Sequence, residues 1–178
     1  MYRNGVRGPH LPILQRELHM HSPTRQGPPN LASLGNIRFT QAYRKEPESV
    51  PLARQRFREA AHDGKLDVEL FQRAELCLCE LAANAVRHAH DPRRNNQILT
   101  EVTIRVIRRR PHLEISVWDI DGRRIPDIPN PDTAALQLAD VSDGAIGGRG
   151  LLLIAAMTDE IGYDLRPQGK RIWCRWAL

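Results

Sequence analysis

One long segment with helical periodicity constrains the fold more than any other part of the sequence. Between Asp67 and the pair Asp91-Pro92, apolar residues recur every three to four positions, which is the spacing of a helix with one buried face. Asp67 is a suitable N-cap for this helix, and Asp91-Pro92 ends it. The segment therefore predicts an amphipathic helix of about six turns.

Alternating, β-branched stretches at 100–107 and 113–119 predict an antiparallel pair of strands. The pattern further predicts helices at 49–64 and 150–157, a closing hairpin over 161–165 and 171–176, and an edge strand at 37–40. Residues 120–148 have no sustained period and predict a long irregular connection, which in a compact domain is usually functional. This order predicts an α+β fold, a two-layer α/β sandwich with helices on one face of a mixed, mainly antiparallel sheet.

Residues 1–36 differ in composition from the rest of the 178-residue chain. They hold five of the 13 prolines and predict a mostly disordered tail, which leaves residues 37–178 as one domain. The net charge of +5 lies largely in this tail, so the nearly neutral domain predicts no nucleic-acid partner. The three cysteines do not form a disulfide framework, and no apolar run could span a membrane. We therefore expect a cytoplasmic protein.

Glu80 and Asn84 are the first candidate site residues. They are four positions apart on the long predicted helix, so both side chains lie on one face. An Asn carbonyl oxygen can bind a magnesium ion that already holds phosphate oxygens, and a glutamate one turn away can accept a proton from an attacking hydroxyl. A polar, solvated helix face would show the same pair. The spacing alone leaves both interpretations open.

Two further features could bind parts of a nucleotide. Asp119 ends a predicted strand, where a carboxylate can accept a hydrogen bond from an exocyclic amine such as that of adenine; a turn-forming aspartate is the alternative. The run Gly147-Gly148-Arg149-Gly150 leads directly into a predicted helix, so backbone amides and the positive end of a helix dipole meet there. Phosphate binding is the natural use of this run, and a flexible link is the alternative.

Other kinds of site have weaker support. Cys77 and Cys79 are two residues apart on the predicted helix, as are His88 and His90, so the members of each pair point to opposite sides and disfavour a zinc site. The arginines at 108–110 occupy a hairpin tip without flanking aromatic residues, which favours a solvated turn over a nucleic-acid contact. No Gly-x-Ser-x-Gly motif is present to indicate a serine nucleophile.

The candidate features, taken in order, resemble one family. Residues 75–89, ELCLCELAANAVRHA, are similar to the N box of the GHKL (Bergerat-fold) ATPases. Within that group they are most similar to the anti-sigma regulatory factors, the serine kinases of partner-switching systems, in their actinobacterial single-domain form. The run 117–119, followed by Pro126, resembles the first glycine box, and the run 148–153 resembles the second. Gly169-Lys170-x-x-Trp173 also fits this subgroup. The resemblance covers roughly residues 45–178.

The resemblance implies that ATP and magnesium lie between the helical layer and a lid that joins Asp119 to the helix at 150–157. The site residues that it implies are Asn84 as the magnesium ligand, Glu80 as the general base, Asp119 as the adenine acceptor, Gly148 and Gly150 as the phosphate-binding end of the lid, and Arg149 as a compensating charge. The chain departs from the family pattern at Asp121, where many members have glycine, and at Lys170, where many have a small hydroxyl residue.

The function that the resemblance implies is an ATP-dependent protein serine kinase. Such a protein phosphorylates an anti-anti-sigma (antagonist) protein and sequesters a sigma factor, and a homodimer is one expected assembly. The alternative is an ATP-responsive regulatory binding module without kinase activity. Glu80 favours the kinase, because a module that only binds has no chemical need for a base beside Asn84.

Overall fold

The computed structural model describes residues 37–62, 66–88, 97–107, 110–119, 125–140, 149–167 and 169–178. The predicted tail at 1–36 lies outside these residues, so its disorder remains a prediction. In the part of the chain that is described, none of the helices has the length and apolar character that crossing a membrane requires.

Five strands form one sheet in the order β1-β2-β3-β5-β4. The strands are β1 (Phe39–Arg44), β2 (Gln97–Ile107), β3 (Arg110–Asp119), β4 (Glu160–Arg166) and β5 (Gly169–Ala177). Every pairing between these described strands is antiparallel, so the expectation of a mixed sheet was wrong. Two of the four pairings, β2 with β3 and β4 with β5, join strands that follow each other along the chain, and short connections of this kind impose antiparallel geometry.

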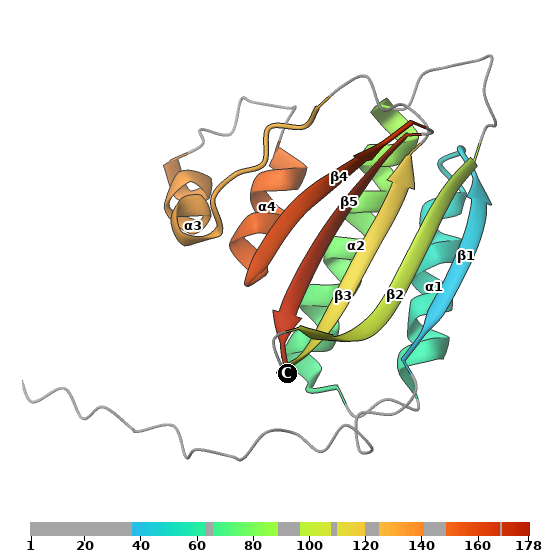
Figure 1. Ribbon diagram of the computed structural model, residues 1–178, viewed down its shortest axis with the longest axis horizontal. Coiled ribbons are helices and arrows are strands. Elements are labelled where there is room, and N and C mark those ends of the chain that lie inside the picture. The colour runs from blue at the N-terminus through green and yellow to red at the C-terminus, as the bar shows by residue number, and fades with distance from the viewer. Residues whose placement is uncertain are drawn as a thin grey trace, which may run out of the picture.

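The helices cover one face of this sheet, as the sequence predicts. They are α1 (Ser49–His62), α2 (Val68–His88), α3 (Pro131–Asp140) and α4 (Arg149–Met157). In Figure 1, α1, α2 and α4 lie behind the sheet, and α3 lies beside α4 at its edge. The α+β fold and its two layers are therefore confirmed.

Helix α3 corrects the prediction of an irregular connection over 120–148. Its start is fixed by Asn130, whose side-chain oxygen accepts a hydrogen bond of 3.0 Å from the backbone N–H of Asp132. Pro131 occupies the first turn, where a missing N–H costs nothing. The helix was missed because its apolar stripe is short, although Asn130-Pro131 is a recognisable start signal.

The core forms between α2 and the middle of the sheet. Asp67 caps α2 as predicted, accepting hydrogen bonds of 3.1 Å from the N–H groups of Glu69 and Leu70. The helix then buries one apolar stripe, which includes Leu78 and Leu81, against β3 and β5. The fully buried residues that face it from the sheet include Leu113, Ile115, Cys174 and Trp176. Because this stripe fixes the rotation of α2, the polar residues beside it face the end of the sheet where β3 stops.

The opposite face of the sheet is covered by its own long side chains. Glu114 is fully buried there and accepts hydrogen bonds from Arg171 and from Arg175, the latter at 2.6 Å. Arg171 also pairs with the half-exposed Asp164 at 3.1 Å. This charged layer lies on the side away from the helices and takes no part in the cavity described next.

Candidate nucleotide-binding site

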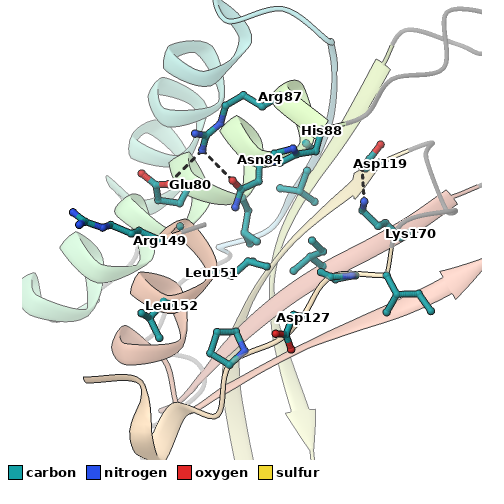
Figure 2. A pocket seen from close by; sticks show the side chains of 18 of the residues that line it. Glu80, Asn84, Arg87, His88, Asp119, Asp127, Arg149, Leu151, Leu152 and Lys170 are labelled. Carbon is teal, nitrogen blue, oxygen red and sulfur yellow. Dashed lines mark hydrogen bonds and ion pairs between the residues drawn. The ribbon is translucent and has the colours of Figure 1, made fainter. Parts of the chain in front are cut away.

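A cavity of about 830 Å³ lies between the helical layer and the sheet. It is lined by the C-terminal half of α2, the ends of β3 and β5, the first turn of α4, α3, and the segment 125–129. Its volume falls within the range of about 300–1,000 Å³ that small-molecule sites occupy. Figure 2 shows one group of polar and charged side chains on α2 and another at the end of the sheet, with Arg149 at the start of α4 and Asp127 on the segment 125–129 outside both groups.

The group on α2 consists of Glu80, Asn84 and Arg87, which line the cavity from successive turns of the helix. The Arg87 guanidinium donates a hydrogen bond of 3.0 Å to Asn84 Oδ1. It also lies 3.9 Å from Glu80 Oε2, and the Glu80 side chain is 30% exposed. One guanidinium therefore holds together the two side chains that the sequence predicts for metal binding and proton transfer.

Gly150 brings the start of α4 against this group. A Cβ at that position would lie 3.0 Å from Glu80 Oε2 and 3.1 Å from Asn84 Nδ2, closer than ordinary van der Waals contact. Only glycine lets the helix start approach α2 this closely without displacing the two side chains. The positive end of the α4 dipole consequently faces the same corner of the cavity, where it favours an anion.

The second group is centred on Asp119 at the end of β3. Asp119 lies directly opposite Lys170 of β5 in the strand register, and the two side chains form an ion pair of 3.2 Å. Lys45, which follows β1, approaches the other carboxylate oxygen at 3.6 Å. Only 3% of the Asp119 side chain is exposed, against 6% for Lys170 and 8% for Lys45. Three charged groups are thus buried together.

The donor set on α2 fits a divalent cation bound together with phosphates. A carbonyl oxygen has two lone pairs, so Asn84 Oδ1 can accept the Arg87 hydrogen bond and still ligate a cation. The space that a Cβ of Gly150 would fill lies next to this oxygen. Magnesium usually takes one or two protein oxygens and completes its shell with water and phosphate oxygens, so one amide oxygen of a residue that lines the cavity suits it.

The structure brings most of the predicted site residues to one cavity. Glu80, Asn84, Arg149 and Gly150 line one part of it and Asp119 another, whereas Gly148 lies outside the described residues. The sequence alone did not predict Arg87 or Lys170 as lining residues of the cavity, or Lys45 as a partner of Asp119. Arg87 lies one turn after Asn84 on the same helix face, and that spacing could have included it. Lys45 carries no local signal, because only the fold brings it to Asp119.

The zinc alternative gains no support. Among the described residues, no group of three or more potential metal-binding side chains clusters closely enough to hold a metal ion. Cys77 is buried in the core, and burial raises the pKa of the Cys79 and Cys174 thiols, which keeps them protonated. His90 lies outside the described residues.

Comparison with known families agrees with the fold and the site. Residues 43–176 match the model of the histidine kinase-like ATPase domain. The match spans most of the chain, which therefore belongs to this family, and membership implies that the domain binds ATP. No curated protein matches the sequence.

Proposed function

We propose that this domain is an ATP-dependent protein serine kinase of the anti-sigma type. It would phosphorylate a serine of an anti-anti-sigma partner and sequester a sigma factor. The observation that carries this proposal is the position of Glu80, which is partly exposed in the cavity beside Asn84 and the start of α4. A carboxylate at this point can act as the base that accepts a proton from the attacking hydroxyl of an acceptor serine.

The reaction asks the protein mainly for positioning and charge neutralisation. The serine oxygen of the partner attacks the γ-phosphorus, its proton passes to Glu80, and the bond from the γ-phosphorus to ADP breaks. When bound, magnesium held through Asn84 supplies positive charge to the phosphates. The start of α4 at Arg149 and Gly150 directs backbone N–H groups towards the same corner.

The alternative function is an ATP-responsive binding module without transfer. The ion pair between Arg87 and Glu80 favours this alternative, because the Arg87 guanidinium lies 3.9 Å from Glu80 Oε2. A guanidinium at this place competes with a hydroxyl donor for the carboxylate. The two functions differ in whether Glu80 is released from Arg87 when nucleotide and partner are bound.

Phosphoryl transfer to a candidate partner decides between them. The purified protein is incubated with magnesium ATP and small antagonist proteins that carry an acceptor serine, and phosphoserine is measured by intact mass. The variant Glu80→Gln should slow transfer by about 100- to 10,000-fold, the usual contribution of a general base, while ATP and the partner still bind. Glu69→Gln is the matched control, because Glu69 is exposed on the first turn of the same helix and should leave transfer unchanged.

Two outcomes would contradict the kinase. Transfer by Glu80→Gln at the wild-type rate would remove Glu80 from the chemistry. A wild-type protein that binds a partner tightly only with ATP, yet transfers no phosphate to any candidate, would establish the binding module instead.

A further inference from the structure

Two of the three lysines in the chain meet at Asp119. Arginine supplies 23 of the 26 basic residues, and the lysines are Lys45, Lys65 and Lys170. Lys45 and Lys170 are the two whose ammonium groups lie 3.6 and 3.2 Å from the Asp119 carboxylate. An ammonium is a compact charge with three donors, whereas a guanidinium is a larger planar fork. We therefore attribute the use of lysine at these two positions to the local geometry.

The two lysines are not equivalent. Lys170 lines the cavity and lies directly across the sheet from Asp119, and Figure 2 shows its side chain reaching from β5 to the Asp119 carboxylate. Lys45, also a described residue, pairs with the other carboxylate oxygen and is not among the residues that line the cavity. Lys45 thus balances the charge of Asp119 without lining the cavity, whereas Lys170 belongs to the cavity wall that a ligand would contact.

We propose that Lys170 reads the nucleobase together with Asp119, an inference that rests on the nucleotide site proposed above. The carboxylate accepts hydrogen bonds and the ammonium donates them, and their facing atoms are 3.2 Å apart. This separation suits neighbouring polar positions on the Watson–Crick edge of a purine. With adenine bound, Asp119 accepts from the N6 amino group and Lys170 donates to the adjacent N1.

The same pair makes the site tolerant of guanine. Guanine presents an O6 acceptor beside an N1–H donor, the reverse of adenine, and a carboxylate alone would meet O6 with acceptor against acceptor. Lys170 can donate to O6 while Asp119 accepts from N1–H if guanine lies shifted along its Watson–Crick edge relative to adenine, and the flexible four-carbon stem of lysine lets the ammonium follow O6. The site should therefore bind ATP and GTP with affinities within about tenfold of each other.

The wild-type protein provides the first test. Its affinities for ATP, GTP and 1-deaza-ATP, in which a C–H replaces N1, are measured by calorimetry with magnesium. We expect GTP to bind within about tenfold of ATP, and 1-deaza-ATP to bind about tenfold more weakly than ATP, because Lys170 would face a C–H. Equal affinity for ATP and 1-deaza-ATP would overturn the role of Lys170.

The variants Lys170→Met and Lys45→Met provide the second test. Each removes one buried ammonium from Asp119 and leaves the other, so the two substitutions are matched in charge and size. Lys170→Met should weaken GTP binding about 100-fold and ATP binding about tenfold, which raises the preference for ATP. Lys45→Met should leave the ratio of the two affinities unchanged. Circular dichroism shows whether each variant is folded. If Lys170→Met does not fold, the wild-type affinities for ATP, GTP and 1-deaza-ATP test the role of Lys170 instead.

The outcomes separate this inference from the function on which it rests. A wild-type protein that binds neither nucleotide overturns the proposed function and the inference together. A protein that binds ATP but binds GTP more than about tenfold more weakly keeps its ATP site and overturns the recognition of guanine by Lys170. The inference is also overturned if a folded Lys170→Met variant keeps the wild-type ratio of ATP affinity to GTP affinity, or if Lys45→Met changes this ratio by the same amount. Both lysines would then be only counter-ions of Asp119.

Discussion

The two ends of the cavity differ in how their charges are held. At the Asp119 end, the carboxylate and both lysines are almost completely buried, and the strand register places Asp119 directly opposite Lys170. At the Asn84 end, Glu80 is partly exposed and Arg87 is mostly exposed, and both project from one helix face. Backbone pairing sets the positions of Asp119 and Lys170 in the first arrangement and leaves only the lysine ammonium free to move on its stem. The second arrangement depends on side-chain rotamers.

This difference has an energetic meaning. Removing one member of a buried charge group leaves its partners without compensation and costs about 3–5 kcal/mol, while an exposed ion pair contributes about 1 kcal/mol or less. The Asp119 end should therefore be part of the folding energy of the domain. The Asn84 end can rearrange around phosphates at little cost to stability.

The largest expected effect is that of Asp119→Asn. The substitution removes the carboxylate that faces two buried ammonium groups, so the free energy of unfolding should fall by about 3 kcal/mol. Nucleotide affinity should fall as well, because an amide can turn a donor towards the base. Urea unfolding and calorimetry measure the two effects.

Asp164→Asn is the control for this prediction. Asp164 is half-exposed in its pair with Arg171, so its substitution should lower the free energy of unfolding by about 0.5 kcal/mol. Equal stability of the two variants would remove the contrast between the two ends.

Asn84→Ala should affect binding without affecting the fold. It removes the side-chain oxygen proposed for magnesium, so ATP affinity in excess magnesium should fall about 100-fold. In EDTA the variant and the wild type should bind ATP almost equally, and their unfolding free energies should agree within about 0.5 kcal/mol. A loss of the same size with and without magnesium would show that Asn84 does not act through the metal.

Gly150→Ala tests the close approach of α4 to α2. The new Cβ would lie 3.0 Å from Glu80 Oε2, so the side chains of Glu80 and Asn84 must shift by a few tenths of an ångström. We expect ATP affinity to fall about tenfold. Thermal stability should be unchanged or slightly higher, because alanine favours a helix more than glycine does. Wild-type affinity in this variant would show that the corner tolerates the displacement.

Glu75→Gln should have the smallest effect on the site, because Glu75 joins α2 to α1 away from the cavity. It pairs with Arg58 and with Arg54, and the hydrogen bond from Arg58, followed by that from Arg54, keeps the pKa of Glu75 below its usual value. The variant should lose about 1 kcal/mol of stability at pH 7 and keep its ATP affinity.

The pH dependence of that loss has a defined sign. A lowered carboxyl pKa stabilises the fold above the unfolded pKa of about 4.3, and this contribution disappears as pH falls through the folded value. The difference in unfolding free energy between wild type and Glu75→Gln should therefore be constant near neutral pH and shrink below about pH 4. A difference that does not depend on pH would exclude the ionised pair as its cause.

The local sequence determined much of this protein. The apolar stripe that begins after Asp67 predicted α2 and the face on which Glu80 and Asn84 lie, because helical spacing is a property of neighbouring residues. Alternating β-branched residues predicted the β2–β3 hairpin for the same reason. The position of Asp119 at a strand end and of Gly150 at a helix start could also be read along the chain.

Tertiary structure alone decided what surrounds those residues. Lys45 and Lys170 are 125 positions apart in the sequence, and no local pattern pairs them; the strand register and the chain following β1 bring both to one buried carboxylate. The hold of Arg87 on Asn84 depends on a rotamer, and the contact of Gly150 with Glu80 depends on how closely α4 packs against α2. Spacing along a chain fixes which face a side chain occupies, but only packing between distant segments fixes its neighbours and its exposure to water, and therefore its electrostatic environment.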